Sequence, residues 1–167
     1  IAIYKPAELI LIDQAETPQH NIRLMMQFEW PDIKAHTIVA SISNYDRMEE
    51  IFKTYKPDYV FHAAAYKHVP LVEYNVIEGV KNNVFGTYNV ARCAAEHNVK
   101  SFVLISTDKA VRPTNVMGAS KRMAELCLQA LSEQLKDYQT CFSMVRFGNV
   151  LGSSGSVIPL FRKQILK

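Results

Sequence analysis

The chain has 167 residues, 49% of them hydrophobic, and a formal net charge of +3. This length supports one globular domain with a sizeable core, and the mild positive charge suits an anionic small molecule. No Lys/Arg run or basic–aromatic stripe indicates a nucleic acid partner, and no apolar run is long enough to cross a membrane. The three scattered cysteines have neither metal-site nor disulfide spacing, so we expect reduced thiols that serve only in packing.

Apolar runs alternate with helical patterns along the whole chain. We expect the tail of a helix over 1–8 and a final apolar helix that runs to the end of the chain. Between them we expect helices over 19–28, 46–55, 71–97 and 115–136, and strands over 8–13, 36–40, 59–65, 101–106 and 140–147. This alternation predicts parallel strands joined by right-handed crossovers, and hence an α/β fold with a doubly wound, Rossmann-like parallel sheet.

The distribution of glycine bears on how a dinucleotide would bind. All six glycines lie at or after Gly79, so the sequence contains no Gly-x-Gly-x-x-Gly loop to hold a pyrophosphate on a helix N-terminus. If 8–13 is the second strand of the sheet, the first strand, its loop and the first helix belong before residue 1. We therefore expect residues 1–167 to form one partial NAD-binding domain, truncated at both ends, without its first strand and poorly stable alone.

The densest group of reactive side chains is Ser-Thr-Asp-Lys at 106–109, directly after the fourth predicted strand. Lys121 follows on the next predicted helix, and ligands of open α/β sheets bind at the carboxyl ends of strands. Thr107 can hydrogen-bond a substrate hydroxyl, Asp108 can act as an acid or base, and Lys109 can act as a base in its neutral form. An isolated Asp-Lys pair is more often a polar turn. Lys121, at a fixed distance along the chain, favours an active site instead.

Other candidates lie near the predicted ends of strands. Asp13 can bond an adenosine ribose, or it can be a turn or capping residue. Ala63 and Ala64 would let a flat cofactor approach the backbone, and Lys67 can meet a phosphate or simply be solvated. Asn83 interrupts an apolar helical pattern and is expected to bond backbone groups beside the active strand. Two nearby histidines without a third ligand are too weak a signal to predict a metal site.

A glycine- and serine-rich stretch over 148–156 follows the last predicted strand. Its amides and hydroxyls can grip a diphosphate, because successive backbone N–H groups form an anion-binding concavity. The alternative is an ordinary flexible loop. These two interpretations stay open.

Four motifs resemble the extended short-chain dehydrogenase/reductase superfamily, and most closely its nucleotide-sugar 4,6-dehydratases of bacterial polysaccharide and glycan biosynthesis. They are HAAAYKHVPL at 62–71, NVFGT at 83–87, STDKAVRPTN at 106–115 and RFGNVLG at 146–152. The resemblance implies a tightly held NAD that oxidises C4 of a UDP-N-acetylhexosamine, and it favours UDP-N-acetylglucosamine as this substrate. The ketone acidifies the C5 proton, water leaves from C6 and the hydride returns to C6, which gives a 4-keto-6-deoxy sugar.

The resemblance also implies a role for individual residues by their motif position. Asp108 would be the acid for the C6 hydroxyl, Lys109 the base at C5, and Thr107 the partner of the C4 oxygen. Lys121 would hold the nicotinamide ribose. We further expect cofactor contacts from Asp13, Ala63, Ala64, Lys67, Asn83 and Ser106, and substrate contacts from Arg146 and Asn149.

Met117 departs from the pattern of the superfamily. It stands four residues before Lys121, a catalytic position that tyrosine usually occupies, and a thioether cannot take a proton. The large membrane-associated dehydratases of capsule and O-antigen type have methionine here, so the resemblance places the chain in that branch. The acceptor of the C4 hydroxyl proton stays open among Thr107, a water molecule and Lys121.

Relatives in this branch carry transmembrane helices before the catalytic domain. We expect a homo-oligomeric bacterial enzyme, cytoplasmic or at the cytoplasmic face of the inner membrane, that binds a UDP-sugar and no nucleic acid. One alternative is an epimerase or reductase on the same fold, which needs no acid–base pair at C5 and C6. Another is a non-catalytic dinucleotide-binding module, favoured by the missing tyrosine. Without a phosphate loop, residues 1–167 alone are expected to bind NAD weakly and to be inactive.

Overall fold

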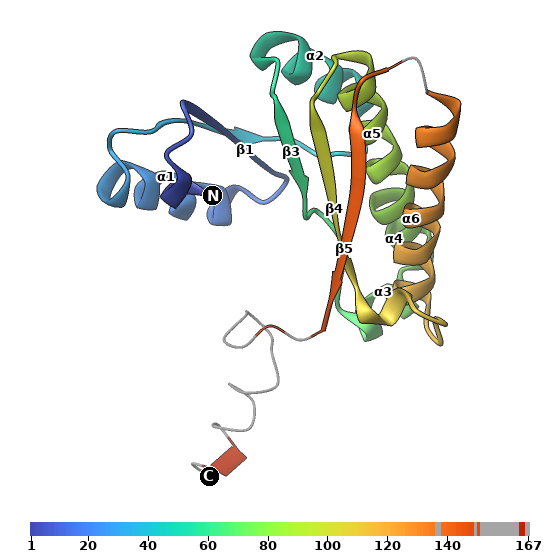
Figure 1. The fold of residues 1–167 in the computed structure, drawn as a ribbon. Helices are drawn as coiled ribbons and strands as arrows, with labels where there is room; N and C mark the ends of the chain where they lie inside the picture. Colours follow the sequence, from blue (N-terminus) through green and yellow to red (C-terminus); the bar gives the residue numbers. More distant parts are fainter. Residues whose placement is uncertain (136–137, 149, 151–163, 166–167) are drawn as a thin grey trace.

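The computed structural model describes residues 1–135, 138–148, 150 and 164–165, and its strands are all parallel. One sheet pairs β1 (Glu8–Asp13) with β2 (Lys34–Val39). The other has the order β3-β4-β5, with β3 (Tyr59–His62), β4 (Ser101–Thr107) and β5 (Cys141–Phe147). The two sheets lie beside one another (Figure 1), and no strand within the described residues joins them by hydrogen bonds. The predicted α/β fold with parallel strands is confirmed.

The helices follow the predicted pattern with two differences. The longer ones are α1 (Glu16–Glu29), α2 (Tyr45–Tyr55), α5 (Thr87–Glu96) and α6 (Val116–Gln134). The predicted helical tail over 1–8 is only a 3-10 turn at Ala2–Tyr4. The single helix predicted over 71–97 is divided into α3 (Val69–Tyr74), α4 (Val76–Val80), a π-helical turn η2 (Lys81–Gly86) and α5. Most of the last predicted helix lies outside the described residues; residues 164–165 of it are described, and both are helical.

The division of this helical region has a local cause. Asn75, between α3 and α4, has φ −131° and ψ 53°, which no continuous helix allows. The wider π turn then shifts the side chains that follow it around the helix axis, a distortion that is frequent at functional sites. The spacing of apolar residues along the sequence indicates neither the break at Asn75 nor the π turn. A single non-helical residue leaves the average spacing close to that of a continuous helix.

The helices α5 and α6 lie against one face of the sheet β3-β4-β5 (Figure 1), and α4 packs against α6. On that side, Phe102 and Leu104 of β4 are fully buried and pack in one core cluster with Met48, Phe52 and Leu128. Residues on the other side of β4 are only half-buried, so this strand is fully covered on one face alone. No helix in the described part of the chain combines the length and the hydropathy that a membrane span needs.

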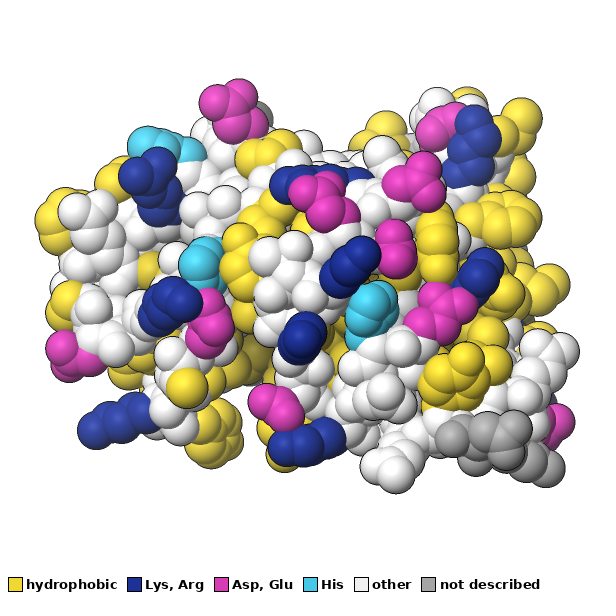
Figure 2. Space-filling view, turned by 90° about the horizontal axis from the view of Figure 1, so that it is seen from above, with side chains coloured by type: hydrophobic (Ala, Val, Ile, Leu, Met, Phe, Trp, Pro, Cys, Tyr) yellow, Lys and Arg dark blue, Asp and Glu magenta, His cyan; other side chains and the backbone are white. Residues whose placement is uncertain are grey.

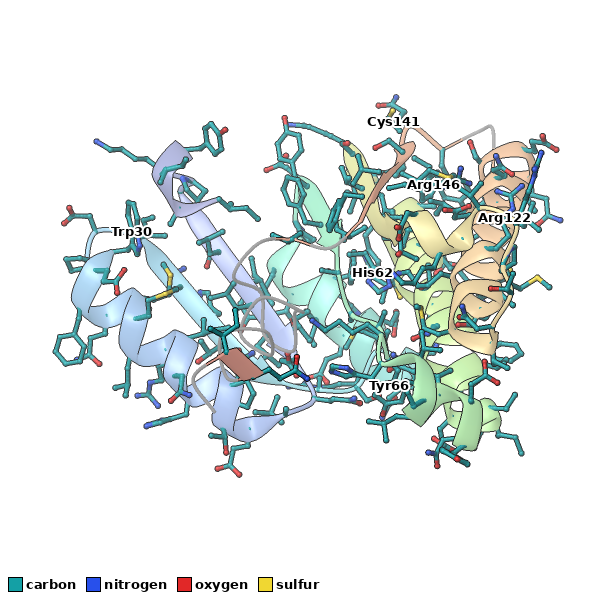
Figure 3. The ribbon with its side chains drawn as sticks, turned by 90° about the horizontal axis from the view of Figure 1, so that it is seen from below. Trp30, His62, Tyr66, Arg122, Cys141 and Arg146 are labelled. Carbon is teal, nitrogen blue, oxygen red and sulfur yellow. The ribbon has the colours of Figure 1, made fainter. Side chains whose placement is uncertain are left out.

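The two ends of the strands differ in character. Figure 2 views the amino-terminal side, where positive and negative side chains are interspersed without a large patch of one sign. Figure 3 views the carboxyl side, toward which Tyr66 lies in the loop that follows β3. The predicted site residues belong to this second side.

Helix α6 begins in close contact with the turn that follows β4, the 3-10 turn η3 (Asp108–Ala110). Asn115 caps the helix, since its Oδ1 accepts the N–H of Gly118 at 2.8 Å. A Cβ at position 118 would lie 2.3 Å from the carbonyl oxygen of Lys109. The glycine is therefore required by the close approach of two backbone segments, and it sets the distance between α6 and the Asp108-Lys109 turn.

Gly118→Ala is expected to destabilise the full-length protein by about 1–3 kcal/mol, because backbone atoms cannot move aside as a flexible side chain can. Urea unfolding measures the loss. Gly79→Ala is the matched control: its Cβ would meet a side-chain atom, Cγ1 of Val72, at 2.7 Å, and alanine also favours the helix. Equal losses in the two variants would contradict the role assigned to Gly118.

Candidate active site

The site is built on the carboxyl end of β4, where the structure brings together three predicted residues. The hydroxyl of Thr107 donates to Oδ1 of Asp108 at 2.9 Å. The ammonium of Lys109 reaches the same oxygen at 3.2 Å. In return, the N–H of Lys109 donates to the Thr107 hydroxyl oxygen at 3.3 Å, which caps η3. A hydroxyl, a carboxylate and an amine thus share one hydrogen-bonded group.

The charges around Asp108 define its resting state. Hydrogen bonds from Thr107 and then Lys109 hold the pKa of Asp108 below its ordinary value, so the group is a carboxylate at neutral pH. Its side chain is 57% exposed and accessible to a ligand. The end of β5 borders it, since a Cβ at Gly148 would lie 3.4 Å from its Oδ2. Asp108 can therefore donate a proton only after receiving one.

Lys121 and Met117 lie on the buried side of α6, 5% and 3% exposed. The Lys121 ammonium donates to the carbonyl oxygen of Ile105 at 2.7 Å, two residues before Thr107 on β4. Burial lowers the pKa of Lys121 to about 8, against the attraction of Glu125. The amine is thus held at the strand end in a mainly charged form at neutral pH.

We expect the Lys121 ammonium to titrate near pH 8, charged below this value and neutral above it. In protein labelled with carbon-13 at the lysine ε-carbons, one NMR signal should shift during a pH titration with a midpoint near pH 8. This signal should be missing from the spectrum of Lys121→Met. Lys100 is the internal comparison, because its bond to Asp58 raises its pKa above the ordinary value. A Lys121 signal that moves only together with those of exposed lysines would contradict the prediction.

Glu125, which the sequence did not single out, is the central buried acid of the site. It is 0% exposed and accepts hydrogen bonds from Ser106 Oγ at 2.6 Å, Arg146 Nε at 2.8 Å and Arg122 Nη1 at 2.9 Å. Arg146 Nη2 binds its second oxygen, so this pair is bidentate. Burial alone would raise the pKa of Glu125, but its donors outweigh burial and lower the pKa to about 2.

This network changes the interpretation of two predicted residues. Ser106 and Arg146 are register partners on β4 and β5, and both side chains bind Glu125 of α6. Figure 3 shows Arg146 and Arg122 on neighbouring elements at this position. Both Ser106 and Arg146 bind Glu125, and the cofactor contact predicted for the first and the substrate contact predicted for the second stay predictions. An acid on the buried stripe of α6, one turn after Lys121, is the sequence signal that could have indicated the network.

Asn83, for which we predicted backbone bonding and a cofactor contact, is likewise bonded within the protein. It is 0% exposed, and its Oδ1 accepts the N–H of Tyr66 at 2.8 Å. Its Nδ2 donates to the Tyr66 carbonyl oxygen and to Ser120 Oγ, both at 3.0 Å. The amide therefore ties the loop after β3 to α6 from the π turn, which agrees with the expected backbone bonding. It positions that loop and exposes no group of its own.

His62 lies beneath the same loop and is 4% exposed. Its Nε2 is 2.9 Å from the hydroxyl of Thr87, which itself donates to the carbonyl oxygen of Asn83 at 2.7 Å. The hydroxyl must therefore accept from the ring, which assigns the hydrogen to Nε2. Burial, and then the charge of Lys121, lower the pKa of His62 to about 3, so the ring is neutral.

The remaining predicted cofactor residues line the carboxyl side of β1 and β3. Asp13 is exposed and forms a turn, in which its Oδ1 accepts the N–H of Ala15 at 2.8 Å. Ala63 is exposed and Ala64 half-buried, and Lys67 is exposed. A carboxylate, small residues and an ammonium have the chemistry that suits the ribose, the flat rings and the phosphates of a dinucleotide. Asn149 and most of the 148–156 loop lie outside the described residues.

The two sheets are linked at this edge by one further contact, in which Nε2 of Gln14 donates to the hydroxyl of Tyr66 at 3.1 Å. It joins the end of β1 to the loop after β3. Within the described residues, no group of three or more His, Cys, Asp or Glu side chains has the arrangement of a metal site.

Parallel strands, a Thr-Asp-Lys turn at the end of β4 and a buried lysine on the following helix define a short-chain dehydrogenase/reductase-type protein. More particularly, the chain belongs to the polysaccharide biosynthesis protein family, whose profile matches residues 1–167. It is 49% identical to the probable polysaccharide biosynthesis protein EpsC of Bacillus subtilis, over 100% of this chain and 28% of that protein. The solved structure of Pen from Bacillus thuringiensis superposes with a TM-score of 0.90 at 38% identity, over 99% of this chain and 51% of Pen.

Relatives with named activities include dehydratases and epimerases. A UDP-N-acetylglucosamine 4,6-dehydratase (inverting) of Campylobacter jejuni is 36% identical over 97% of this chain and 47% of the relative. A UDP-glucose 4-epimerase of Rickettsia bellii is 38% identical over 95% of this chain and 45% of the relative. At 21% identity, the dTDP-glucose 4,6-dehydratase DesIV of Streptomyces venezuelae, solved with NAD bound, shares the fold with a TM-score of 0.76. The chain thus spans between about a quarter and about a half of the length of these relatives.

Proposed function

We propose that the full-length protein is an NAD-dependent nucleotide-sugar 4,6-dehydratase, with UDP-N-acetylglucosamine as the first substrate to test. Its product would be a 4-keto-6-deoxy sugar for surface polysaccharide or glycan synthesis. The observation that carries this proposal is the Thr107-Asp108-Lys109 group, in which a hydroxyl and an amine both bind one carboxylate oxygen. Removing water across C5 and C6 needs a base at one carbon and an acid at the next, and this group supplies both.

NAD, when bound, supplies the reversible oxidation of C4 that makes the C5 proton acidic. Asp13 would hold the adenosine ribose, with the small side chains of Ala63 and Ala64 against the flat rings and Lys67 at a phosphate. Lys121 would hold the nicotinamide ribose from its position below the end of β4. Asp13, Ala63 and Lys67 are exposed, and each group has the chemistry that its part of the dinucleotide needs.

The chain's own residues would then act on the sugar in order. Thr107 hydrogen-bonds the C4 oxygen. Lys109, in its neutral form, takes the proton from C5, and Asp108 gives a proton to the C6 oxygen as it leaves as water. Lys121 and Glu125 keep the end of β4 fixed against α6 while this happens. Met117 contributes no proton, because its thioether has none to give and no basic site to accept one.

The test is incubation of the full-length protein with UDP-N-acetylglucosamine, followed by mass spectrometry of the nucleotide sugar. Dehydration lowers the mass by one water molecule and leaves a ketone that a carbonyl reagent captures. Unchanged mass with a new sugar epimer would identify an epimerase, which the 38% identical Rickettsia relative supports as the second candidate. Bound cofactor without any turnover would support a non-catalytic module.

A further inference from the structure

We propose that Gln14 and Tyr66 form a clasp that retains the dinucleotide cofactor during turnover. The Nε2 amide of Gln14 donates to the hydroxyl oxygen of Tyr66 at 3.1 Å, between residues 52 positions apart in the chain. We call this pair the Gln14–Tyr66 clasp. The inference rests on the cofactor assignment in the proposed function, and it adds to that assignment two residues that close over the cofactor.

The two halves of the clasp belong to the segments that carry the proposed cofactor contacts. Gln14 directly follows Asp13, the residue proposed for the adenosine ribose. Tyr66 follows Ala63 and Ala64 in the loop after β3, on the carboxyl side of the sheet (Figure 3). A dinucleotide bound by these neighbours extends from one half of the clasp to the other. The hydrogen bond therefore joins the two protein segments that would hold it.

Hydrogen bonds to the backbone hold each of these segments in place. On the β1 side, Oδ1 of Asp13 accepts the N–H of Ala15 at 2.8 Å, which closes a turn with Gln14 at its centre. On the other side, the buried amide of Asn83 binds both the N–H and the carbonyl oxygen of Tyr66, at 2.8 and 3.0 Å. The two side chains therefore extend from fixed backbones, so closing the clasp orders little more than the side chains themselves.

The clasp lies at the surface, which allows it to open. Gln14 is exposed, and Tyr66 is 39% exposed. A single neutral hydrogen bond at the surface is weak, so the clasp can open to admit a cofactor. In the closed form, the Tyr66 hydroxyl accepts from Gln14 and keeps its own hydrogen to donate to a ribose or phosphate oxygen. A bound dinucleotide thereby adds a bond to the closed form, and the closed form slows its departure.

Retention has a purpose in the proposed reaction, because the hydride taken from C4 is returned to the same sugar. Loss of the reduced cofactor before that return would leave an oxidised sugar and a protein without the hydride. Gln14 and Tyr66 move neither a proton nor a hydride. They are positioning residues that lengthen the residence time of the cofactor, and their effect is separable from that of the Thr107-Asp108-Lys109 group.

The test measures how fast NAD leaves the full-length protein. Protein saturated with radiolabelled NAD is mixed with excess unlabelled NAD, and the label that stays bound is followed by rapid filtration. Tyr66→Phe and Gln14→Leu should each raise the dissociation rate about two- to tenfold, the effect of losing one hydrogen bond. The double variant should dissociate no faster than the faster single variant, because both substitutions break the same bond.

Tyr45→Phe is the matched control, because it removes a tyrosine hydroxyl that donates to Glu96 of α5 at 2.7 Å. It should leave the dissociation rate of NAD unchanged. A wild-type rate in Tyr66→Phe, or single effects that multiply in the double variant, would overturn the clasp. Failure of the full-length protein to convert UDP-N-acetylglucosamine would count against the proposed function only, since the dissociation rates still decide on the clasp. A full-length protein that binds no NAD would overturn both.

Discussion

Asp108→Asn and Lys109→Met are each expected to abolish 4-keto product in the full-length protein, with losses of about 10²–10⁴-fold in turnover. Asparagine has the shape of aspartate and still accepts the Thr107 hydrogen bond, but it cannot carry a proton to the C6 oxygen. Methionine keeps the length of the lysine side chain without a basic nitrogen. The measurement is the rate of carbonyl formation from UDP-N-acetylglucosamine, with the fraction of bound substrate determined separately.

The chain offers a matched control for both substitutions at the opposite end of the same sheet. Asp58 and Lys100 form an exposed ion pair at 2.8 Å, just before β3 and β4 begin. The side chains are 61% and 67% exposed, similar in chemistry to the active pair but remote from it. Asp58→Asn and Lys100→Met should leave turnover unchanged. Full turnover in Asp108→Asn or Lys109→Met would remove the roles assigned here.

Glu125→Ala is expected to destabilise the protein by about 3–5 kcal/mol, the largest stability effect anticipated in the described part of the chain. The substitution leaves Arg146, Arg122 and Ser106 without their shared acceptor at a position that is 0% exposed. It also releases the ends of β4 and β5 from α6. Turnover should therefore fall even under conditions in which the protein is still folded. Urea unfolding of the full-length protein measures the free energy.

Two comparisons make the Glu125 prediction specific. Glu78→Ala removes a helix-surface pair with Lys81, in which both side chains are 59% exposed, and should change stability by less than about 1 kcal/mol. Glu125→Gln keeps the shape but removes the charge. Because the pKa of Glu125 is lowered from 4.5 to about 2, its contribution is complete above pH 4.5 and is lost as the pH falls toward 2. The stability difference between wild type and Glu125→Gln should shrink over that interval, and a difference independent of pH would contradict the assignment.

The parts of the site that are contiguous in the chain could be predicted from the sequence. Thr107, Asp108 and Lys109 follow a strand whose apolar run is evident, and a strand end is where parallel sheets present reactive groups. Local chemistry also sets the start of α2, where Oδ1 of Asn44 caps the helix by accepting the N–H of Arg47. Prediction from apolar spacing failed over 71–97, where Asn75 and the π turn break one apolar pattern into several helical pieces.

The sequence by itself therefore determined the order and type of the elements, and the composition of the turn after β4. Only the tertiary structure decided where Ser106, Arg146 and Asn83 point, since their partners Glu125 and Tyr66 lie 17 to 21 residues away along the chain. Burial leaves a carboxylate or an amide no water to bind, so its partner is whichever group the packing brings near. Turn and strand preferences are set by neighbouring residues, whereas these hydrogen bonds exist only once α6 has packed against the ends of β4 and β5.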